Sequence, residues 1–308
     1  MECASSPQMS NGTSTPRVSL IVATLGRYEE IGLFLASLAG QTSPASTFEV
    51  IVVDQNDRLD LRPVLSVYDG RLSIGHVRSP QKGLSVSRNI GLDIARGEIV
   101  AFPDDDCTYY PDTLERVCAY FDTHRESAVV LGAIYDRASQ TPLVRRWPSE
   151  PRRVSKWNFY LLLSSVTIFS RAREVRFDER LGAGAKFGSN EDADYVYRVL
   201  DSGLVARYEP SIQVWHKAMP TSQSSPARVS RYGAGFGAFV AKNMSLTCFV
   251  LLLRAVSYHF AVAAKAICAL NPRRARVHVI ASLSRIAGAF RFGLLHVLKD
   301  TSGGGSGN

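Results

Sequence analysis

The chain has 308 residues, of which 45% are apolar and 21% are charged, and it carries a formal net charge of +8. This balance is typical of a globular protein and argues against a chain that is disordered throughout. Because 308 residues are many for one hydrophobic core and few for two full domains, we expect one domain of catalytic size with an appendage.

The two ends of the chain differ from the rest in composition. Residues 1–16 and 301–308 are small and polar, which predicts disordered tails. The five cysteines are scattered without metal-ligand spacing, and no secretory leader is recognisable at the start. This use of cysteine favours a reducing, cytoplasmic compartment. The cysteines are Cys3, Cys107, Cys118, Cys248 and Cys268.

Apolar runs and helical periodicity alternate through the first hundred residues. The pattern predicts strands over 18–24, 48–57, 72–79 and 98–106, and helices over 28–41 and 83–97. Strand and helix in alternation are typical of a parallel sheet with helices on both faces. The fold class that we expect is therefore α/β, with a doubly wound, mostly parallel sheet.

The pattern changes after residue 110. Further strands are predicted over 125–136, 161–171 and 205–217, with a helix over 190–203 that has acids in its first turn. From about residue 227 the chain reads as helices. Glycines at 233, 235 and 237 do not follow a strand, so they predict close helix packing and not a dinucleotide-binding loop.

Carboxylates gather where predicted strands end. Thr24, Asp54 and the run Asp104–Asp106 all follow apolar strands, and in a doubly wound sheet such positions converge on one crevice. Oxygen ligands at i and i+2, as in Asp104 and Asp106, suit Mg²⁺ or Mn²⁺. The alternative is a solvated turn in which aspartate caps the next helix.

Four segments together resemble a family of known enzymes. They are "VSLIVATLGR", "FEVIVVDQND", "GLSVSRNIGLDIARGEIVAFPDDD" and "GSNEDADYVYRVLDSG". In this order they look like a family-two glycosyltransferase of the GT-A fold, of the kind that builds bacterial envelope polysaccharides. The resemblance runs from about Arg17 to Lys217. It implies a catalytic domain over 17–220, followed by a helical region over 221–300.

The resemblance also implies a role for individual residues. Asp104 and Asp106 would form the DxD element that holds a divalent cation, Mn²⁺ or Mg²⁺, with His216 as a further ligand. Asp192 would be the general base, with Glu191 as a second candidate. The nucleotide sugar would be bound by Ala23, Thr24, Arg27, Asp54, Lys82, Gly83, Arg88, Asn89, Asp104 and Asp105. Arg88 as a surface charge and His216 as a core residue remain the alternatives.

The implied reaction moves a hexosyl or deoxyhexosyl group from a nucleotide-diphosphate sugar to a hydroxyl of a glycan or polyprenyl-linked acceptor. A cation would stabilise the diphosphate leaving group, and Asp192 would take the acceptor proton from the opposite side of the sugar, which predicts inversion. Two alternatives remain open: a nucleotidyltransferase, and a non-catalytic subunit that binds a sugar nucleotide.

The basic charge is concentrated in the last quarter of the chain. Residues 221–308 hold eleven lysines and arginines and one acid, whereas residues 1–220 hold 25 and 27. Charges interrupt both long apolar stretches, so we predict no transmembrane span. Basic amphipathic helices suit the inner face of a cell membrane, bound peripherally; packing on the core or in a dimer is the alternative. No motif indicates a nucleic acid as partner.

Overall fold

The computed structural model describes residues 15–217 and 225–302, with side chains up to residue 295. The predicted tails therefore lie almost wholly outside the described residues. The chain divides into two compact units, one of residues 1–177 with 195–218 and the other of residues 178–194 with 219–308. The domain boundary expected at residue 220 stays a prediction.

The first unit is built on one mixed sheet, with ten strands among the described residues. Its strands β3, β2, β1 and β4 are parallel, as the alternation of strand and helix predicts. Strand β9 then pairs antiparallel with both β4 and β6, and β10 pairs parallel with β6 and antiparallel with β5. The order is β3 (Ile74–Arg78), β2 (Phe48–Asp54), β1 (Val18–Thr24), β4 (Ile99–Ala101), β9 (Ile168–Ser170), β6 (Ser127–Asp136), β10 (Val205–His216) and β5 (Cys107–Tyr109), with β7 (Thr141–Pro142) on β6 and β8 (Arg152–Val154) on β10.

Two expected strands differ from the structure. The segment 161–171 begins with the end of helix α5 and a 3-10 turn, and only its last part is strand β9. The strand expected over 98–106 ends at Ala101, because the chain turns to bring the aspartates to the sheet edge. The other helices and turns of this part of the chain are α1 (Glu29–Ala39), η1 (Ala45–Thr47), α2 (Arg62–Ser66), α3 (Leu84–Ile94), α4 (Thr113–Thr123), α5 (Phe159–Leu162), η2 (Ser165–Thr167) and α6 (Glu191–Asp201).

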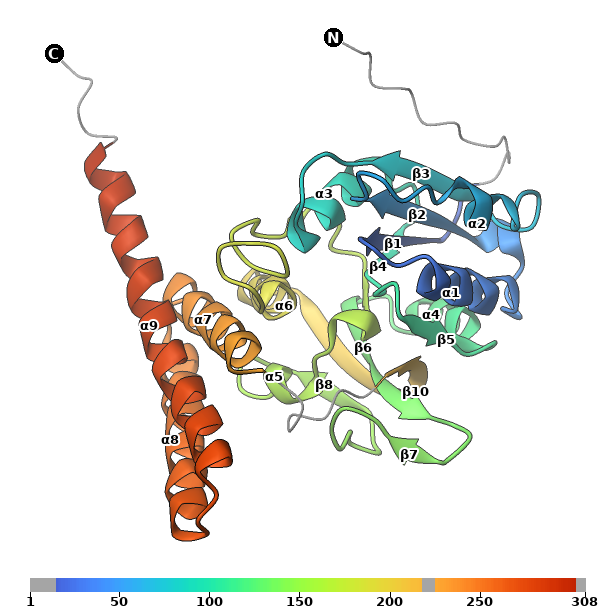
Figure 1. Ribbon diagram of the computed structural model, residues 1–308. Helices are drawn as coiled ribbons and strands as arrows, with labels where there is room; N and C mark the ends of the chain where they lie inside the picture. Colours follow the sequence, from blue (N-terminus) through green and yellow to red (C-terminus); the bar gives the residue numbers. More distant parts are fainter. Residues whose placement is uncertain (1–14, 218–224, 303–308) are drawn as a thin grey trace, which may run out of the picture. The chain divides into compact units, whose positions relative to one another are not determined.

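Helices cover both faces of the parallel strands (Figure 1). Alternate residues of β1 point to opposite faces, so Leu20 packs in one core with Leu35 of α1, while Ile21 meets α3 on the other face. Helix α3 comes this close because Gly91 has no side chain: a Cβ there would lie 2.2 Å from Cγ2 of Ile21. The predicted fold class is therefore confirmed for this unit.

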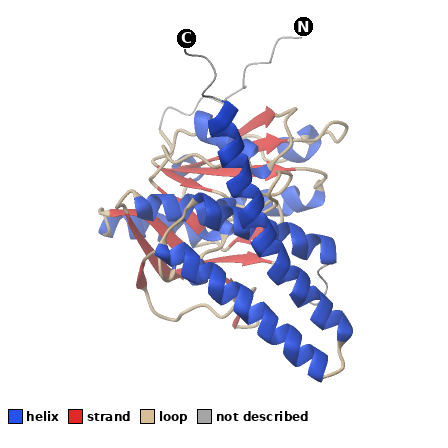
Figure 2. Cartoon of the chain, turned by 90° about the vertical axis from the view of Figure 1, so that its left-hand side faces the viewer, coloured by secondary structure: helices blue, strands red, loops and turns tan. Residues whose placement is uncertain are grey.

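The second unit is helical. It contains α7 (Pro226–Lys242), α8 (Leu246–Cys268) and α9 (Pro272–Ser302), and α8 and α9 run side by side as a hairpin (Figure 2). Helices α7 and α9 pack closely through glycine. A Cβ at Gly237 would lie 2.0 Å from the carbonyl oxygen of Arg285, and one at Gly288 would lie 2.2 Å from that of Ala234. The close packing predicted from the glycine run is confirmed.

Helix α8 is the one helix in the described part of the chain whose length and apolar composition would allow it to cross a membrane. Its most apolar stretch has a mean hydropathy of 1.7, and only 11% of that stretch is buried within the protein. Arg254 and Lys265 interrupt the helix and are exposed. The absence of a span stays a prediction, since length and composition alone do not separate a crossing helix from one that lies on a surface.

Candidate active site

The strand-end residues of the first unit meet at one edge of the sheet. Thr24 and Asp54, the last residues of β1 and β2, are neighbours in the parallel register. Asp104 forms an isolated parallel bridge with Ala23, so the aspartate run lies beside the same strand end. The convergence expected for these residues is therefore present in the fold.

Asp104, Asp106 and His216 form a cluster of potential metal ligands. One donor atom from each of the three lies within 4.8 Å of the others. Nε2 of His216 lies 3.3 Å from Oδ1 of Asp106 and 3.9 Å from Oδ2 of Asp104. Strand β10 brings the histidine there, because its end pairs with β5, directly after the aspartates.

These three residues fit a divalent cation. Two carboxylates offer hard oxygen ligands and the imidazole adds a nitrogen, a donor set that suits Mn²⁺. Although burial alone would lower the pKa of His216, its hydrogen bond to Asp106 and the nearby carboxylates raise it. Because imidazole must lose its proton to bind a metal, a cation would take the place of that proton.

Arg27 lies against the same carboxylates. Its Nη1 donates to Oδ2 of Asp106 at 2.8 Å, and its Nε lies 3.8 Å from Oδ1 of Asp105. The hydrogen bond from His216, with the charges of His216 and Arg27, holds the pKa of Asp106 at about 2. Asp106 is therefore ionised and ready to bind a cation at neutral pH.

Asp105 has a different environment from its two neighbours. Its side chain is more buried than those of Asp104 and Asp106. Burial, assisted by the charges of those neighbours, raises the pKa of Asp105 to about 6, although Arg27 opposes the shift. Among the three adjacent aspartates, the outer two belong to the cluster with His216 and the middle one is set apart.

Arg88 is buried in the interior and is not a surface charge. Only 1% of it is exposed, and its Nη2 donates to Oδ1 of Asp104 at 3.2 Å. The guanidinium also lies 5.2 Å from the ring centre of Phe177 and 5.9 Å from that of Phe102. A buried arginine needs a charged partner to offset the cost of its burial. The hydrogen bond from Arg88 therefore fixes the position of the Asp104 carboxylate.

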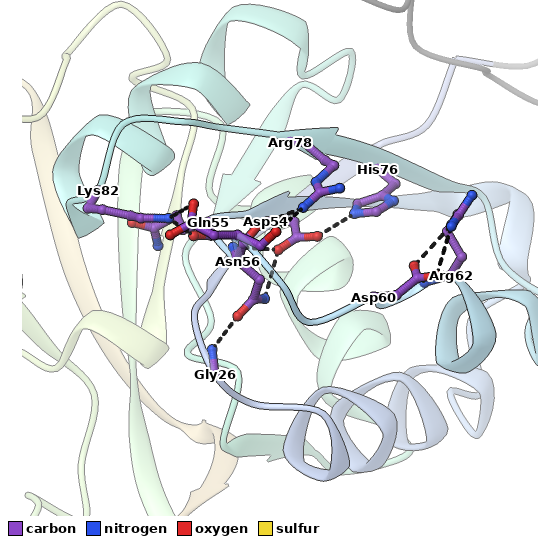
Figure 3. A network of polar contacts seen from close by, with 10 residues as sticks. Gly26, Asp54, Gln55, Asn56, Asp60, Arg62, His76, Arg78 and Lys82 are labelled. Carbon is purple, nitrogen blue, oxygen red and sulfur yellow. Dashed lines mark hydrogen bonds and ion pairs between the residues drawn. The ribbon is translucent and has the colours of Figure 1, made fainter.

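Asp54 organises the loop that follows β2 (Figure 3). It is 1% exposed; its Oδ1 accepts hydrogen bonds from the backbone and side-chain nitrogens of Asn56, and its Oδ2 lies 3.0 Å from Nε2 of His76. Oδ1 of Asn56 in turn accepts from the backbone nitrogen of Gly26 at 2.6 Å. The loops after β1 and β2 are therefore joined through Asp54, whose expected contact with a base stays a prediction.

Basic side chains from β3 and the turn after it hold the other side of this loop. Arg78 donates to the carbonyl oxygen of Asn56 at 2.7 Å, while Lys82 contacts the carbonyl oxygen of Gln55 and, at 2.7 Å, Oδ1 of Asp57. Figure 3 shows these side chains pointing toward the loop. The Lys82 ammonium group is therefore bound to the loop after β2, and its contact with a diphosphate remains a prediction.

Gly83 and Asn89, at the start and middle of α3, have structural partners. Gly83 has φ of 139°, a conformation that favours glycine, and its nitrogen donates to Oε1 of Gln55 at 2.7 Å. The amide of Asn89 bonds the backbone of Phe177 twice, at 3.0 and 2.8 Å. Both residues therefore stabilise the segments that contact α3, and their role toward a nucleotide stays a prediction.

Glu191 and Asp192 begin α6 and belong to the second unit. Asn190 before them has φ of 67°, which turns the chain into the helix. Asp192 is half-buried, and its Oδ1 accepts from the backbone nitrogen of Ala193 at 2.8 Å. Asp194, in the same turn, is fully buried and accepts from Lys242 at 2.8 Å.

Our sequence reasoning missed Asn56, His76 and Arg78. Asn56 carried a detectable signal, because an asparagine two residues after a strand-end aspartate is a common turn former. His76 and Arg78 carried none: each is one polar residue on a short strand, and only the pairing of β2 with β3 brings His76 to Asp54.

Comparison with known proteins places this geometry in a family. Residues 19–181, more than half of the chain, match the family described as Glycosyl transferase family 2. Validoxylamine A glucosyltransferase of Streptomyces hygroscopicus subsp. jinggangensis is 30% identical over 143 residues, which are 44% of this chain and 34% of that protein. Poly(ribitol-phosphate) beta-N-acetylglucosaminyltransferase TarS of Staphylococcus aureus is 30% identical over 117 residues, 37% of this chain and 20% of TarS. The matched residues thus span about a third of the length of the first relative and a fifth of the second.

Solved structures agree in fold. Residues 1–349 of S. aureus TarS superpose with a TM-score of 0.56 and 18% identity, covering 90% of this chain and 91% of that one. The mannosyltransferase PcManGT from Pyrobaculum calidifontis, in complex with GDP-Man and Mn²⁺, gives a TM-score of 0.60 and 18% identity, covering 91% and 88%. The GT-A fold expected from the sequence is confirmed. With the family match over residues 19–181, the chain belongs to glycosyl transferase family 2.

Proposed function

We propose that this chain is an inverting, metal-dependent glycosyltransferase. It transfers a hexosyl or deoxyhexosyl group from a nucleotide-diphosphate sugar to a hydroxyl of a glycan or lipid-linked acceptor in envelope polysaccharide synthesis. The observation that carries the proposal is the cluster of Asp104, Asp106 and His216 at the strand ends. Three structures of two relatives support the donor class: TarS has been solved with UDP and with UDP-GlcNAc, and PcManGT with GDP-Man and Mn²⁺.

Asp104, Asp106 and His216 would hold the cation, which would offset the charge that develops on the diphosphate as the bond to the sugar breaks. Arg88 keeps Asp104 oriented, and Arg27 keeps Asp106 ionised. Arg27 is 40% exposed in its side chain, so it can turn from Asp106 toward a phosphate. The protein thus supplies both the ligands and a mobile positive charge for the leaving group.

Asp192 is the acid of the first α6 turn best suited to take the acceptor proton. Glu191 is buried, and Asp194 is buried and paired with Lys242, so both side chains are enclosed by the protein. Asp192 is half-buried, so its carboxylate remains accessible, as a general base requires. Attack assisted from the side opposite the leaving group would invert the anomeric carbon.

The second unit supports a peripheral place on the inner face of a membrane. Between residues 225 and 295 it has ten lysines and arginines and no acid, together with many exposed apolar side chains. This combination favours an anionic lipid surface. The described cysteines are all free, which agrees with a reducing compartment.

The test is hydrolysis of UDP- and GDP-sugars in the presence of Mn²⁺. We expect turnover that is lost in EDTA, and a decrease of about 100-fold or more in Asp192→Asn, the size of a general-base contribution. Glu191→Gln is the matched control and should stay close to wild type.

Donor binding by calorimetry completes the experiment. Asp192→Asn should bind the sugar nucleotide and Mn²⁺ as tightly as wild type, because the role proposed for Asp192 is toward the acceptor hydroxyl. Turnover within a few-fold of wild type in this variant would show that the base lies elsewhere. Binding without turnover in the wild-type chain, over the whole donor panel, would favour the non-catalytic alternative.

A further inference from the structure

An apolar groove of about 590 Å³ lies within the second unit. It is bounded by the end of α7, the start of α8 and the C-terminal half of α9. Its walls are aliphatic and aromatic, with Ser245 as the one side chain bearing a polar group. The residues that line it are Val240, Ala241, Met244, Ser245, Phe249, Leu252, Ile286, Ala289, Phe290, Gly293 and Leu294.

The surface around the groove is apolar as well. Met244 is 82% exposed, Phe290 70% and Phe249 61%, so the rim offers large side chains to whatever lies above it. Leu270, beyond the opposite end of α8, is also 89% exposed. An exposed apolar groove of this kind marks a site of interaction with another molecule or a membrane.

The charges on the same unit are of one sign. Arg291 lies between the groove residues Phe290 and Gly293 in the sequence of α9 and is exposed. Arg254, two residues after the groove residue Leu252 in the sequence of α8, is exposed as well. Exposed arginines at 273, 274 and 276 follow the hairpin tip in sequence. No acid occurs between residues 225 and 295. An occupant that brings negative charge beside its apolar part is therefore favoured.

We propose that this groove binds one hydrocarbon chain of an anionic phospholipid from a membrane surface. The inference deepens the membrane-surface role proposed above and rests on it. The volume lies in the range of ordinary small-molecule sites, and the nearly uniform apolar lining suits an alkyl chain, which has no polar group to satisfy. Arg291 pairs with the lipid phosphate.

Charge decides against a second copy of this chain as the occupant. Two copies that cover each other's grooves would bring two surfaces of the same positive sign together, which costs free energy. A phospholipid instead brings its phosphate to the arginines and its chain to the groove. Both properties of the surface are then used by one ligand.

The experiment fills the groove without changing its charge. A Cβ at Gly293 would have no atom within 4 Å, so Gly293→Phe can place its ring in the groove without a clash, and the helix gains from losing a glycine. Ala287→Phe adds the same ring at an exposed position of α9 that does not line the groove. It is the matched control.

The probe is dodecyl phosphate below its micellar concentration, measured by calorimetry on the full chain. We expect one site per chain, weakened at least tenfold in Gly293→Phe and less than twofold in Ala287→Phe. Arg291→Gln should weaken the alkyl phosphate several-fold but not an uncharged dodecyl glycoside. Inorganic phosphate alone should not compete.

The results that would overturn the proposal are distinct. Absence of saturable binding, or equal loss in both phenylalanine variants, excludes a chain site in this groove. A wild-type dimer in sedimentation that becomes a monomer in Gly293→Phe assigns the groove to a second copy. Flotation with phosphatidylglycerol vesicles tests the membrane role separately, and sugar-nucleotide hydrolysis in Gly293→Phe tests the proposed activity separately, so each can fail alone.

Discussion

Replacing Asp106 by asparagine tests the proposed metal site most directly. The substitution keeps the size and shape of the side chain and removes one negative charge from the cluster. In the structure this carboxylate accepts from Arg27 at 2.8 Å and lies 3.3 Å from Nε2 of His216. Asparagine can still accept from Arg27, so the fold should survive and the loss should be confined to cation binding.

The expected size of the loss follows from charge. An interaction with a charged group contributes about 1.5–3 kcal/mol. At about 1.4 kcal/mol per factor of ten, this is roughly 10- to 150-fold in Kd for Mn²⁺. The low pKa of Asp106, about 2, means that wild type presents the full charge at neutral pH, so the whole effect should be visible at pH 7.

Titration of Mn²⁺ by electron paramagnetic resonance measures this Kd directly. Asp105→Asn is the matched control, because Asp105 lies between the two ligands in sequence but is not part of the cluster. It should change Kd for Mn²⁺ by less than threefold. If Asp106→Asn bound Mn²⁺ like wild type while Asp105→Asn did not, the choice of the outer two aspartates as ligands would be refuted.

Four further outcomes are expected. Arg27→Gln should lower Kd for Mn²⁺ in the absence of nucleotide, since a competing cation is removed, and should raise KM for the donor. If Kd and KM both rose or both fell, the proposed roles of Arg27 at Asp106 and at a phosphate would be contradicted. His76→Ala should raise donor KM about tenfold with little change in kcat, and His76→Gln should recover part of it, because the histidine positions its partner carboxylate on β2. Lys242→Met should lower the free energy of unfolding by about 3 kcal/mol and Tm by about 5 °C or more, since it leaves Asp178 and buried Asp194 without their shared cation; an unchanged Tm would exclude this. Although burial alone would raise the pKa of Asp178, its two cationic partners lower it. The contribution of Asp178 to the stability of the fold is therefore complete above about pH 4 and is lost as pH falls. The urea midpoint should drop less toward pH 2 in Asp178→Asn than in wild type.

The sequence by itself determined the parallel half of the sheet and the position of the acidic cluster. Residues 20–23 and 50–53 are continuous apolar runs, and such runs signal buried parallel strands through local composition alone. Asp54 is the last residue of β2 and Asp104–Asp106 come shortly after β4, so the end of the sheet on which they lie could be inferred without coordinates. Close helix packing at Gly237 was likewise a local signal.

Only the tertiary structure decided which distant residues meet. The antiparallel pairing of β10 with β5 brings His216 to Asp106, which from the sequence only the resemblance implied. Helix α3 carries Arg88 to Asp104, where the arginine is buried, so the alternative of a surface charge is wrong. The contact of His76 with Asp54 depends on the register between two short strands. Local sequence sets the period and the ends of an element. The partners of a side chain depend instead on contacts between residues that are separated by 16 positions for Arg88 and Asp104 and by 22 for His76 and Asp54, and a short stretch of sequence does not contain the energies of these contacts.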